Sequence, residues 1–274
     1  MAGMTGALGT PVTLAQIRSL AYRVGKNTER RMRTSGWMKR QPWFWPAKRF
    51  LKRISGKELW LKPEVTHRTQ KTAEWTYIVD RLGADSIVYS LGVGDNIDFD
   101  LGIIERFGAS VFAFDPTPYA KEWIESRDLP ARLVFKPWAA SGVDGSLRLY
   151  RRVSRRGKKA KVMWTAEGEA GDVGDFIDAP AYTVHTMMDK LGHAKVDLLK
   201  MDVEGAEYGI LDGLKHASHP PEQLLVEFHH RFPGIGKERT AAAIRGLAAI
   251  GYKIFDVSET GREIGFVLTN GDTE

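Results

Sequence analysis

The sequence predicts an α/β fold built on a doubly wound, mostly parallel sheet that follows a basic helical arm. Ile87–Leu91 is an apolar run suited to a central strand, and a turn with two glycines follows it. Apolar residues then recur at helical spacing as far as Phe107, and a second apolar run ends in Asp115. Near the C-terminus, two strand-like runs flank a short turn, which indicates an antiparallel hairpin.

Size and composition narrow the class of protein. At 274 residues, the chain is long enough for one α/β domain with appendages. It contains no cysteine, which excludes disulfides and thiolate metal sites and makes a cytoplasmic location the expectation. No apolar run reaches the roughly 20 residues of a membrane-spanning helix, and residues 1–14 lack the features of a secretory signal.

The positive charge is concentrated at the N-terminus. Residues 1–65 hold 14 Lys or Arg and three acidic residues, so the net charge of +6 comes from this arm and the remainder is net acidic. Aromatic residues alternate with cationic ones over residues 37–53. This pattern predicts that residues 30–53 contact an anionic membrane surface, making the protein peripheral to the inner face of a membrane. Single-stranded nucleic acid is an alternative partner, and a third interpretation is that the tryptophans only cap the core.

Residues 66–274 are expected to form the ligand-binding domain. Its strand and helix pattern is interrupted over residues 146–182 by a charged hairpin and an acidic, glycine-rich loop, which we interpret as an insertion. Before the first strand, the spacing of apolar residues predicts a helix over 72–82. After the insertion, residues 183–186 are expected to form a short strand.

The two-glycine turn indicates a site for a nucleotide cofactor. Gly92 and Gly94 remove Cβ atoms where a ligand passes close to the backbone, and the helix that follows offers its N-terminus. Asp115 lies 21 residues after Gly94, where a carboxylate can bind both hydroxyls of an adenosine ribose. Trp138 ends the third strand and could lie against an adenine ring, although such a ring is as often part of the core.

Acidic residues and a histidine follow two later strands. Asp202 and Glu204 come directly after the apolar run that begins at Val196, and Glu227 and His229 end the next apolar run. These positions fall at the carboxyl edge of the sheet, where open α/β sheets bind ligands. Glu207 falls in the first turn of the next helix, where a negative charge favours the helix dipole.

Three segments together resemble the FkbM-type S-adenosylmethionine-dependent methyltransferases: residues 88–96, 113–118 and 199–207, with 226–229 fitting the same family's fifth strand. The resemblance covers about residues 85–270, and the run from Lys200 to Glu207 is its most specific part. It implies a Rossmann-like methyltransferase sheet, S-adenosylmethionine as cofactor, and O-methylation of a hydroxyl on a small-molecule or glycan acceptor, namely a sugar, glycolipid or natural product. Ser90 departs from the pattern, because these enzymes commonly carry an acid there.

Ten residues are candidates for the site of a methyl-transfer reaction. Cofactor binding is assigned to Gly92, Gly94, Asp95, Asp115, Pro116 and Trp138. The acceptor side is assigned to Asp202, Glu204, Glu227 and His229. His229 is the more natural base because imidazole titrates near neutrality, and Asp202 would orient it or act itself. A divalent metal held by Asp202, Glu227 and His229 is chemically feasible, but the spacing is no recognised metal motif, so no metal is expected.

Three other functions compete with this interpretation. A nucleic-acid methyltransferase would use the basic arm, but the strand that ends at Asp202 lacks the Pro-Pro-aromatic tetrad that surrounds a flipped base. A non-catalytic membrane-docking protein on a methyltransferase fold is favoured by Ser90. A nicotinamide oxidoreductase would more often have a third glycine where this chain has Ile97.

Overall fold

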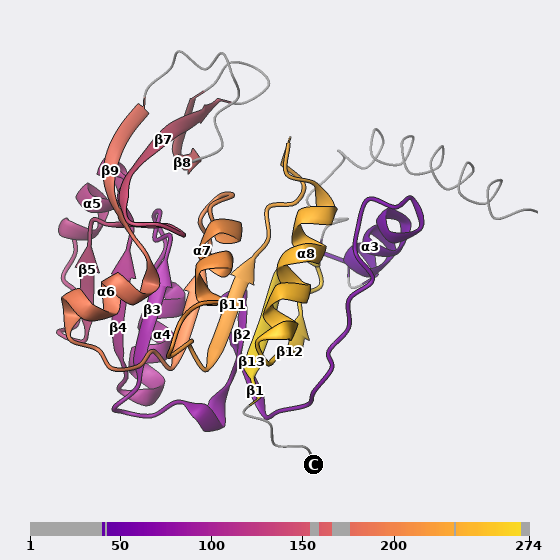
Figure 1. Cartoon of the computed structure of the whole chain (residues 1–274), viewed down its shortest axis with the longest axis horizontal. Coiled ribbons are helices and arrows are strands. Elements are labelled where there is room, and N and C mark those ends of the chain that lie inside the picture. The colour runs from indigo at the N-terminus through magenta and orange to yellow at the C-terminus, as the bar shows by residue number, and fades with distance from the viewer. Residues whose placement is uncertain (1–39, 42, 154–158, 166–175, 233, 270–274) are drawn as a thin grey trace, which may run out of the picture. The chain divides into compact units, whose positions relative to one another are not determined.

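The computed structural model describes residues 40–41, 43–153, 159–165, 176–232 and 234–269 (Figure 1). The chain divides into two compact units, Met1–Trp60 and Leu61–Glu274. Most of the predicted basic arm and of the acidic loop lies outside the described residues. None of the described helices is both long enough and apolar enough to span a membrane.

The described part of the first unit contains helix α3 (Phe44–Ile54). Its cations are Lys48, Arg49, Lys52 and Arg53. Large apolar side chains remain exposed in and beside this helix: Trp43 is 55% exposed, Phe50 53% and Trp60 64%. The rings of Phe50 and Trp60 meet edge to face, with their centroids 6.2 Å apart.

A seven-stranded sheet organises the second unit, in the order β12-β13-β11-β10-β3-β4-β5. Its strands are β3 (Ile87–Leu91), β4 (Ser110–Phe114), β5 (Leu133–Lys136), β10 (Leu198–Met201), β11 (Gln223–Glu227), β12 (Tyr252–Val257) and β13 (Glu263–Leu268). The five strands from β11 to β5 are parallel, and β13 pairs antiparallel with both β11 and β12. The predicted doubly wound sheet with its closing hairpin is therefore confirmed.

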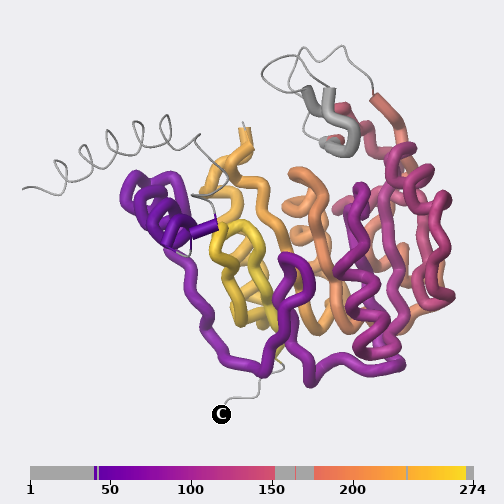
Figure 2. The backbone as a smooth tube through the Cα atoms, turned by 180° about the vertical axis from the view of Figure 1, so that it is seen from behind, coloured from indigo at the N-terminus to yellow at the C-terminus, as the bar shows by residue number. Residues whose placement is uncertain are grey.

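Helices cover both faces of this sheet. They are α4 (Asp98–Phe107), α5 (Pro118–Glu125), α6 (Val184–Leu191), α7 (Glu207–Leu214) and α8 (Gly236–Ala249). Helices α6, α7 and α8 lie on the face shown in Figure 1, whereas α4 lies on the face shown in Figure 2. Side chains of β3 alternate between the two cores: Val88 packs with α4, and Tyr89 and Leu91 pack with the other helices. Burial on both faces explains why this strand is apolar except at Ser90.

The predicted helix over 72–82 is wrong. These residues form a hairpin of β1 (Thr69–Thr72) and β2 (Trp75–Ile78), followed by the 3₁₀ turn η1 (Val79–Arg81). The side-chain amide of Gln223 bonds both the N–H and the carbonyl of Ile78, at 2.8 and 3.3 Å. This contact fixes the hairpin against the start of β11 in the large sheet and has no local sequence signal.

The predicted strand over 183–186 is also wrong. The strand is β9 (Phe176–Tyr182), and Thr183 is the N-cap of α6, with its hydroxyl accepting from the Thr186 N–H at 3.1 Å. Together with β6 (Ala139–Ala140), β7 (Gly145–Val153) and β8 (Lys159–Thr165), β9 forms a four-stranded sheet in the order β6-β9-β7-β8. The N-cap role explains why the β-branched residues here do not extend the strand.

Candidate active site

The turn after β3 is shaped by two glycines in left-handed conformations, with φ of +83° at Gly92 and +57° at Gly94. A Cβ at Gly92 would lie 1.8 Å from the carbonyl oxygen of Asp202, so no larger residue fits. Asp202, directly after β10, is therefore the residue that leaves no room for a side chain at Gly92. This contact places the glycine turn beside the residues predicted to face the acceptor. The ammonium group of Lys200 also bonds the Gly92 carbonyl at 2.9 Å.

Asp115 braces this turn from the end of β4. Its Oδ2 accepts from the N–H groups of Val93 and Gly94 at 3.0 and 2.9 Å. Its Oδ1 accepts from the N–H and the hydroxyl of Thr117 at 2.9 and 2.6 Å. All four acceptor positions of the carboxylate are therefore used. The predicted contact with a ribose remains a prediction, and a ribose hydroxyl would have to replace one of these donors.

A buried polar cluster lies beneath the turn. Lys200, Asp100 and Ser90 are 6%, 2% and 0% exposed, and the Lys200 ammonium lies 5.4 Å from the centre of the Trp75 ring. Burial raises the pKa of the Asp100 carboxyl, against the opposing effects of the Lys200 charge and the Ser90 hydroxyl. Ser90 stands where related enzymes commonly carry an acid, and in this chain a carboxylate from α4 lies beside it.

One cavity of about 220 Å³ joins the two predicted halves of the site. All six residues predicted to bind the cofactor line it, together with two of the predicted acceptor residues: Gly92, Gly94, Asp95, Asp115, Pro116, Trp138, Asp202 and Glu204. The small sheet contributes Leu147, Leu149 and Trp164 to its wall. Glu227 and His229 do not line the cavity among the described residues, but they contact Asp202 from the neighbouring strand.

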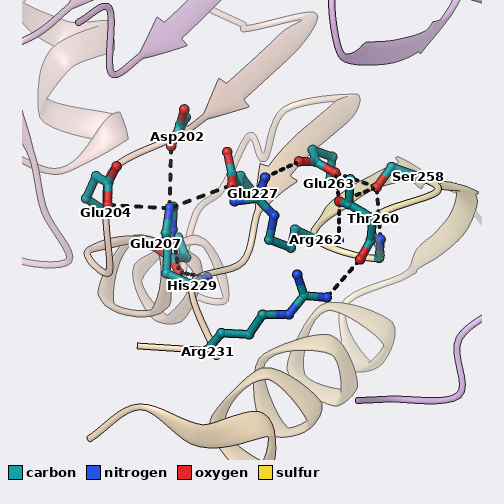
Figure 3. A network of polar contacts seen from close by, with 11 residues as sticks. Asp202, Glu204, Glu207, Glu227, His229, Arg231, Ser258, Thr260, Arg262 and Glu263 are labelled. Atoms are coloured by element: carbon teal, nitrogen blue, oxygen red, sulfur yellow. Dashed lines mark hydrogen bonds and ion pairs between the residues drawn. The ribbon is translucent and has the colours of Figure 1, made fainter. Parts of the chain in front are cut away.

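The acceptor residues surround a buried imidazole (Figure 3). The side chain of His229 is 4% exposed, and its Nε2 faces three carboxylates, with Asp202 Oδ1 at 3.6 Å, Glu204 Oε2 at 3.8 Å and Glu227 Oε1 at 4.0 Å. Its Nδ1 lies 3.4 Å from Glu207 Oε1. The structure thus brings all four predicted acceptor residues together.

The carboxylates change the titration of the groups at the centre of this cluster. Burial disfavours the His229 imidazolium, but the negative charges of Glu207, Glu204 and Asp202 outweigh burial and raise the pKa of His229. Burial raises the pKa of Glu227 to about 7, and the charge of Asp202 acts in the same direction. Arg262 pairs with Glu227 and opposes this rise.

Sequence reasoning missed the role of Glu207. Its carboxylate is fully buried and accepts from the N–H groups of Gly205 and His229 at 2.9 and 2.8 Å. It therefore fixes the backbone after β10 and the backbone after β11, one on each side of the acceptor cluster. The sequence had predicted only that its charge favours the helix dipole. Its place in the run from Lys200 to Glu207 was the available signal. Lys200 and Arg262 were missed because their partners lie on other strands.

Glu204 adopts a strained backbone conformation, with φ of +49°. For a residue with a Cβ this left-handed conformation costs on the order of 1 kcal/mol. The turn nevertheless places the Glu204 carboxylate at the cavity and near His229. Strain of this kind is commonly stored at functional sites.

The fold and the cavity define a class of protein. The strand order reverses between β3 and β10, and ligands of open α/β sheets bind at that point. A glycine turn without Cβ atoms, the Asp115 carboxylate and the half-buried Trp138 ring suit the polar and aromatic parts of an adenosine. The chain has the architecture of a methyltransferase that uses S-adenosylmethionine.

Comparison with known proteins identifies the family. Residues 91–254 match the methyltransferase FkbM domain, which is more than half of the chain, so the chain belongs to this family. S-adenosylmethionine is the methyl donor of this fold. No curated protein matches the sequence significantly.

Solved structures of low sequence identity are similar to this chain. A methyltransferase FkbM from Methylobacillus flagellatus KT is similar over 91% of this chain and 58% of its own, with 12% identity and a TM-score of 0.45. This chain therefore spans less than two thirds of that protein. The fibrillarin pre-rRNA processing protein of Methanococcus jannaschii is similar over 71% of this chain and 70% of its own, with 13% identity and a TM-score of 0.42. Fibrillarin from Aeropyrum pernix, crystallised with natively bound S-adenosylmethionine, is similar over 69% of this chain and 68% of its own, with 12% identity and a TM-score of 0.35.

Proposed function

We propose that this methyltransferase acts on oxygen, methylating a hydroxyl of a sugar, glycolipid or natural product. The observation that carries the proposal is the buried His229 among three carboxylates, two of which line the cavity beside the glycine turn. A neutral hydroxyl must lose its proton as it attacks a methyl group, and this cluster offers several groups that accept one.

The residues of the chain divide the work between binding and proton transfer. S-adenosylmethionine supplies an electrophilic methyl group on sulfur. The glycine turn and Asp115 hold the adenosine end, and Trp138 borders it. Asp202 and Glu204 face the acceptor, because they line the same cavity. The proton of the acceptor hydroxyl passes from its oxygen toward Nε2 of His229, and the raised pKa of His229 favours the imidazolium that results. Glu207, beside Nδ1, orients the ring.

The charge of the acceptor cluster disfavours nucleic acid as substrate. Asp202 and Glu204 line the cavity, and their carboxylates would repel the phosphates of a strand entering it, whereas nucleic-acid binding relies on neutralising those phosphates. A neutral hydroxyl compound meets no such repulsion.

Incubation with isotope-labelled S-adenosylmethionine and cell extract tests the proposal. We expect label in a neutral, base-stable product of the glycan, glycolipid or small-molecule fraction. Asp202→Asn should abolish most of the transfer, whereas Asp212→Asn, an exposed acid paired with Lys215, should not change it. Label that appears in RNA, or on a nitrogen, would contradict O-methylation.

We also propose that the region of α3 contacts an anionic membrane surface. Three exposed aromatic rings lie in or beside a helix with four cations, and such rings settle at the level of the lipid headgroups. The protein should sediment with vesicles that contain phosphatidylglycerol and less with neutral vesicles. Replacing Trp43 and Phe50 with Ser should weaken this binding, whereas equal sedimentation with both vesicle types would contradict it.

A further inference from the structure

Three side chains of the acceptor cluster have the arrangement of a cation site. Asp202 follows β10, and Glu227 and His229 lie at the end of β11. One ligand atom from each of the three lies within 4.8 Å of the other two. From Nε2 of His229 the distances to the carboxylate oxygens are 3.6 Å for Asp202 and 4.0 Å for Glu227.

The imidazole itself points to a missing partner. His229 is 4% exposed, and its buried Nδ1 makes no hydrogen bond to any residue that the structure describes. Its Nε2 faces the centre of the cluster, where the carboxylate oxygens of Asp202, Glu204 and Glu227 lie at 3.6–4.0 Å. Buried ring nitrogens are normally bonded. The Glu207 carboxylate, 3.4 Å from Nδ1, favours a proton on that nitrogen and so leaves the lone pair of Nε2 directed at Asp202 and Glu227. A carboxylate behind a histidine is a common arrangement at metal sites.

The charges of the cluster are not balanced by nearby cations. Within the described residues, Asp202 and Glu207 pair with no lysine or arginine, and Arg262 is the one such cation that contacts Glu227. Buried carboxylates are normally paired or bound to a metal. A divalent cation at the centre of Asp202, Glu227 and His229 would supply the missing charge.

We propose that Asp202, Glu227 and His229 bind one divalent cation. Two carboxylate oxygens and one imidazole nitrogen suit Mn²⁺ or Mg²⁺, with Mn²⁺ favoured by the nitrogen ligand. With metal–ligand bonds of about 2.1 Å, neighbouring ligand atoms lie about 3.0 Å apart in an octahedron. The observed distances of 3.6 and 4.0 Å close to this value by side-chain movements of about 1 Å or less.

The position suggests what the cation does, and this part rests on the proposed function. Asp202 also lines the cavity, so a cation that it binds lies where the acceptor oxygen is expected. There the cation lowers the pKa of the acceptor hydroxyl and orients it. Nε2 of His229 is then a ligand, and Glu204, which lines the cavity outside the ligand set, is the carboxylate left to receive the acceptor proton.

Titration of the full chain with Mn²⁺, followed by the electron paramagnetic resonance of the free ion, tests the site. We expect one saturable Mn²⁺ per chain. Asp202→Asn should weaken binding at least about tenfold, and Glu207→Gln, which removes the negative charge behind the histidine, about tenfold. His185 and Asp189 form an exposed pair of the same residue types, 3.5 Å apart, and Asp189→Asn should leave binding unchanged.

The outcomes separate this site from the proposed function. Absence of saturable Mn²⁺ binding, or binding that Asp202→Asn does not weaken, overturns the cation site. If S-adenosylmethionine still binds in that case, the methyltransferase assignment is untouched. Saturable Mn²⁺ binding without methyl transfer to any hydroxyl compound supports the site and contradicts O-methylation.

Discussion

The two ends of the cavity differ in how their polar groups are satisfied. At the glycine turn, the Asp115 carboxylate accepts four hydrogen bonds and the Lys200 ammonium bonds the Gly92 carbonyl. At the predicted acceptor end, His229 lies among carboxylates at 3.4–4.0 Å, its Nδ1 makes no hydrogen bond to a described residue, and Glu204 is strained. The polar groups at the glycine turn are thus paired within the protein, whereas the carboxylates around His229 mostly face one another and its ring.

This contrast predicts how substitutions at the two ends of the cavity affect stability, donor binding and methyl transfer. A satisfied network stabilises the fold and shapes the place for the donor, so changes there should affect donor binding and stability together. An unsatisfied, charged cluster costs stability, so changes there should affect transfer far more than donor binding. The four predictions below test this separation, from the largest expected effect to the smallest.

Replacement of His229 by Gln should lower the rate of methyl transfer by about 10²–10⁴, because the cluster loses Nε2, which accepts the acceptor proton or, when a cation is bound, holds that cation while Glu204 accepts the proton. The affinity for S-adenosylmethionine should change by less than about threefold, since His229 does not line the cavity. Transfer kinetics and calorimetry measure the two quantities. His193→Gln is the control, because that histidine bonds Tyr89 elsewhere in the fold. If His229→Gln also lost affinity for S-adenosylmethionine, donor binding and methyl transfer would not depend on separate ends of the cavity.

Replacement of Asp115 by Ala should weaken S-adenosylmethionine binding by about 100-fold or more, because the turn loses charged hydrogen bonds worth about 1.5–3 kcal/mol each. Calorimetry with the donor measures this. Asp144 also accepts from a backbone N–H and a threonine hydroxyl, at Thr183 and Thr186, but does not line the cavity. Asp144→Ala should therefore keep the wild-type affinity, and equal losses in both variants would show a general folding effect.

Replacement of Lys200 by Met should destabilise the protein by about 3 kcal/mol, because it leaves the buried Asp100 carboxylate without its opposing charge. Denaturant unfolding measures the loss. Adding Asp100→Asn should recover part of it, as expected of coupled residues. Lys121→Met removes an exposed lysine that pairs with the exposed Glu125 and should cost less than about 1 kcal/mol. A Lys200→Met variant as stable as wild type would show that the cluster does not brace the turn.

Replacement of Glu204 by Gly should raise stability by about 1 kcal/mol while lowering the transfer rate, because glycine relieves the strain at φ +49° but removes the carboxylate. Thermal unfolding and kinetics measure the two effects. Ala73 is the other described non-glycine residue with positive φ, at +52° in the turn between β1 and β2. Ala73→Gly should bring a similar stability gain with no change in rate. A faster Glu204→Gly enzyme would exclude a functional role for the strain.

The sequence predicted that the glycine turn and Asp115 lie together, because the features that place them are local. The glycines follow directly on an apolar strand, and Asp115 comes 21 residues later at the end of the next strand, so one βαβ unit places them together. The hairpin before β3 was not predictable in the same way. Its turn uses Ala73, which has no preference for positive φ, and its end is held by Gln223, 145 residues away.

The acceptor end was predicted in its members but not in its arrangement. Asp202, Glu204, Glu227 and His229 were named because parallel strands end at the same edge of the sheet. The sequence did not reveal that Glu207 would hold the backbone of His229, or that Arg262 would pair with Glu227, because both contacts cross between elements. Register between strands decides such contacts, and no single segment encodes it.

A crystal structure with bound S-adenosylhomocysteine tests the central claim most directly, that the glycine turn and Asp115 hold the adenosine of a methyl donor. We predict that the adenosine lies in the cavity between the turn and Trp138, with a ribose hydroxyl replacing one of the present hydrogen bonds to Asp115. A ligand bound elsewhere, or a ribose that does not touch Asp115, would contradict the account.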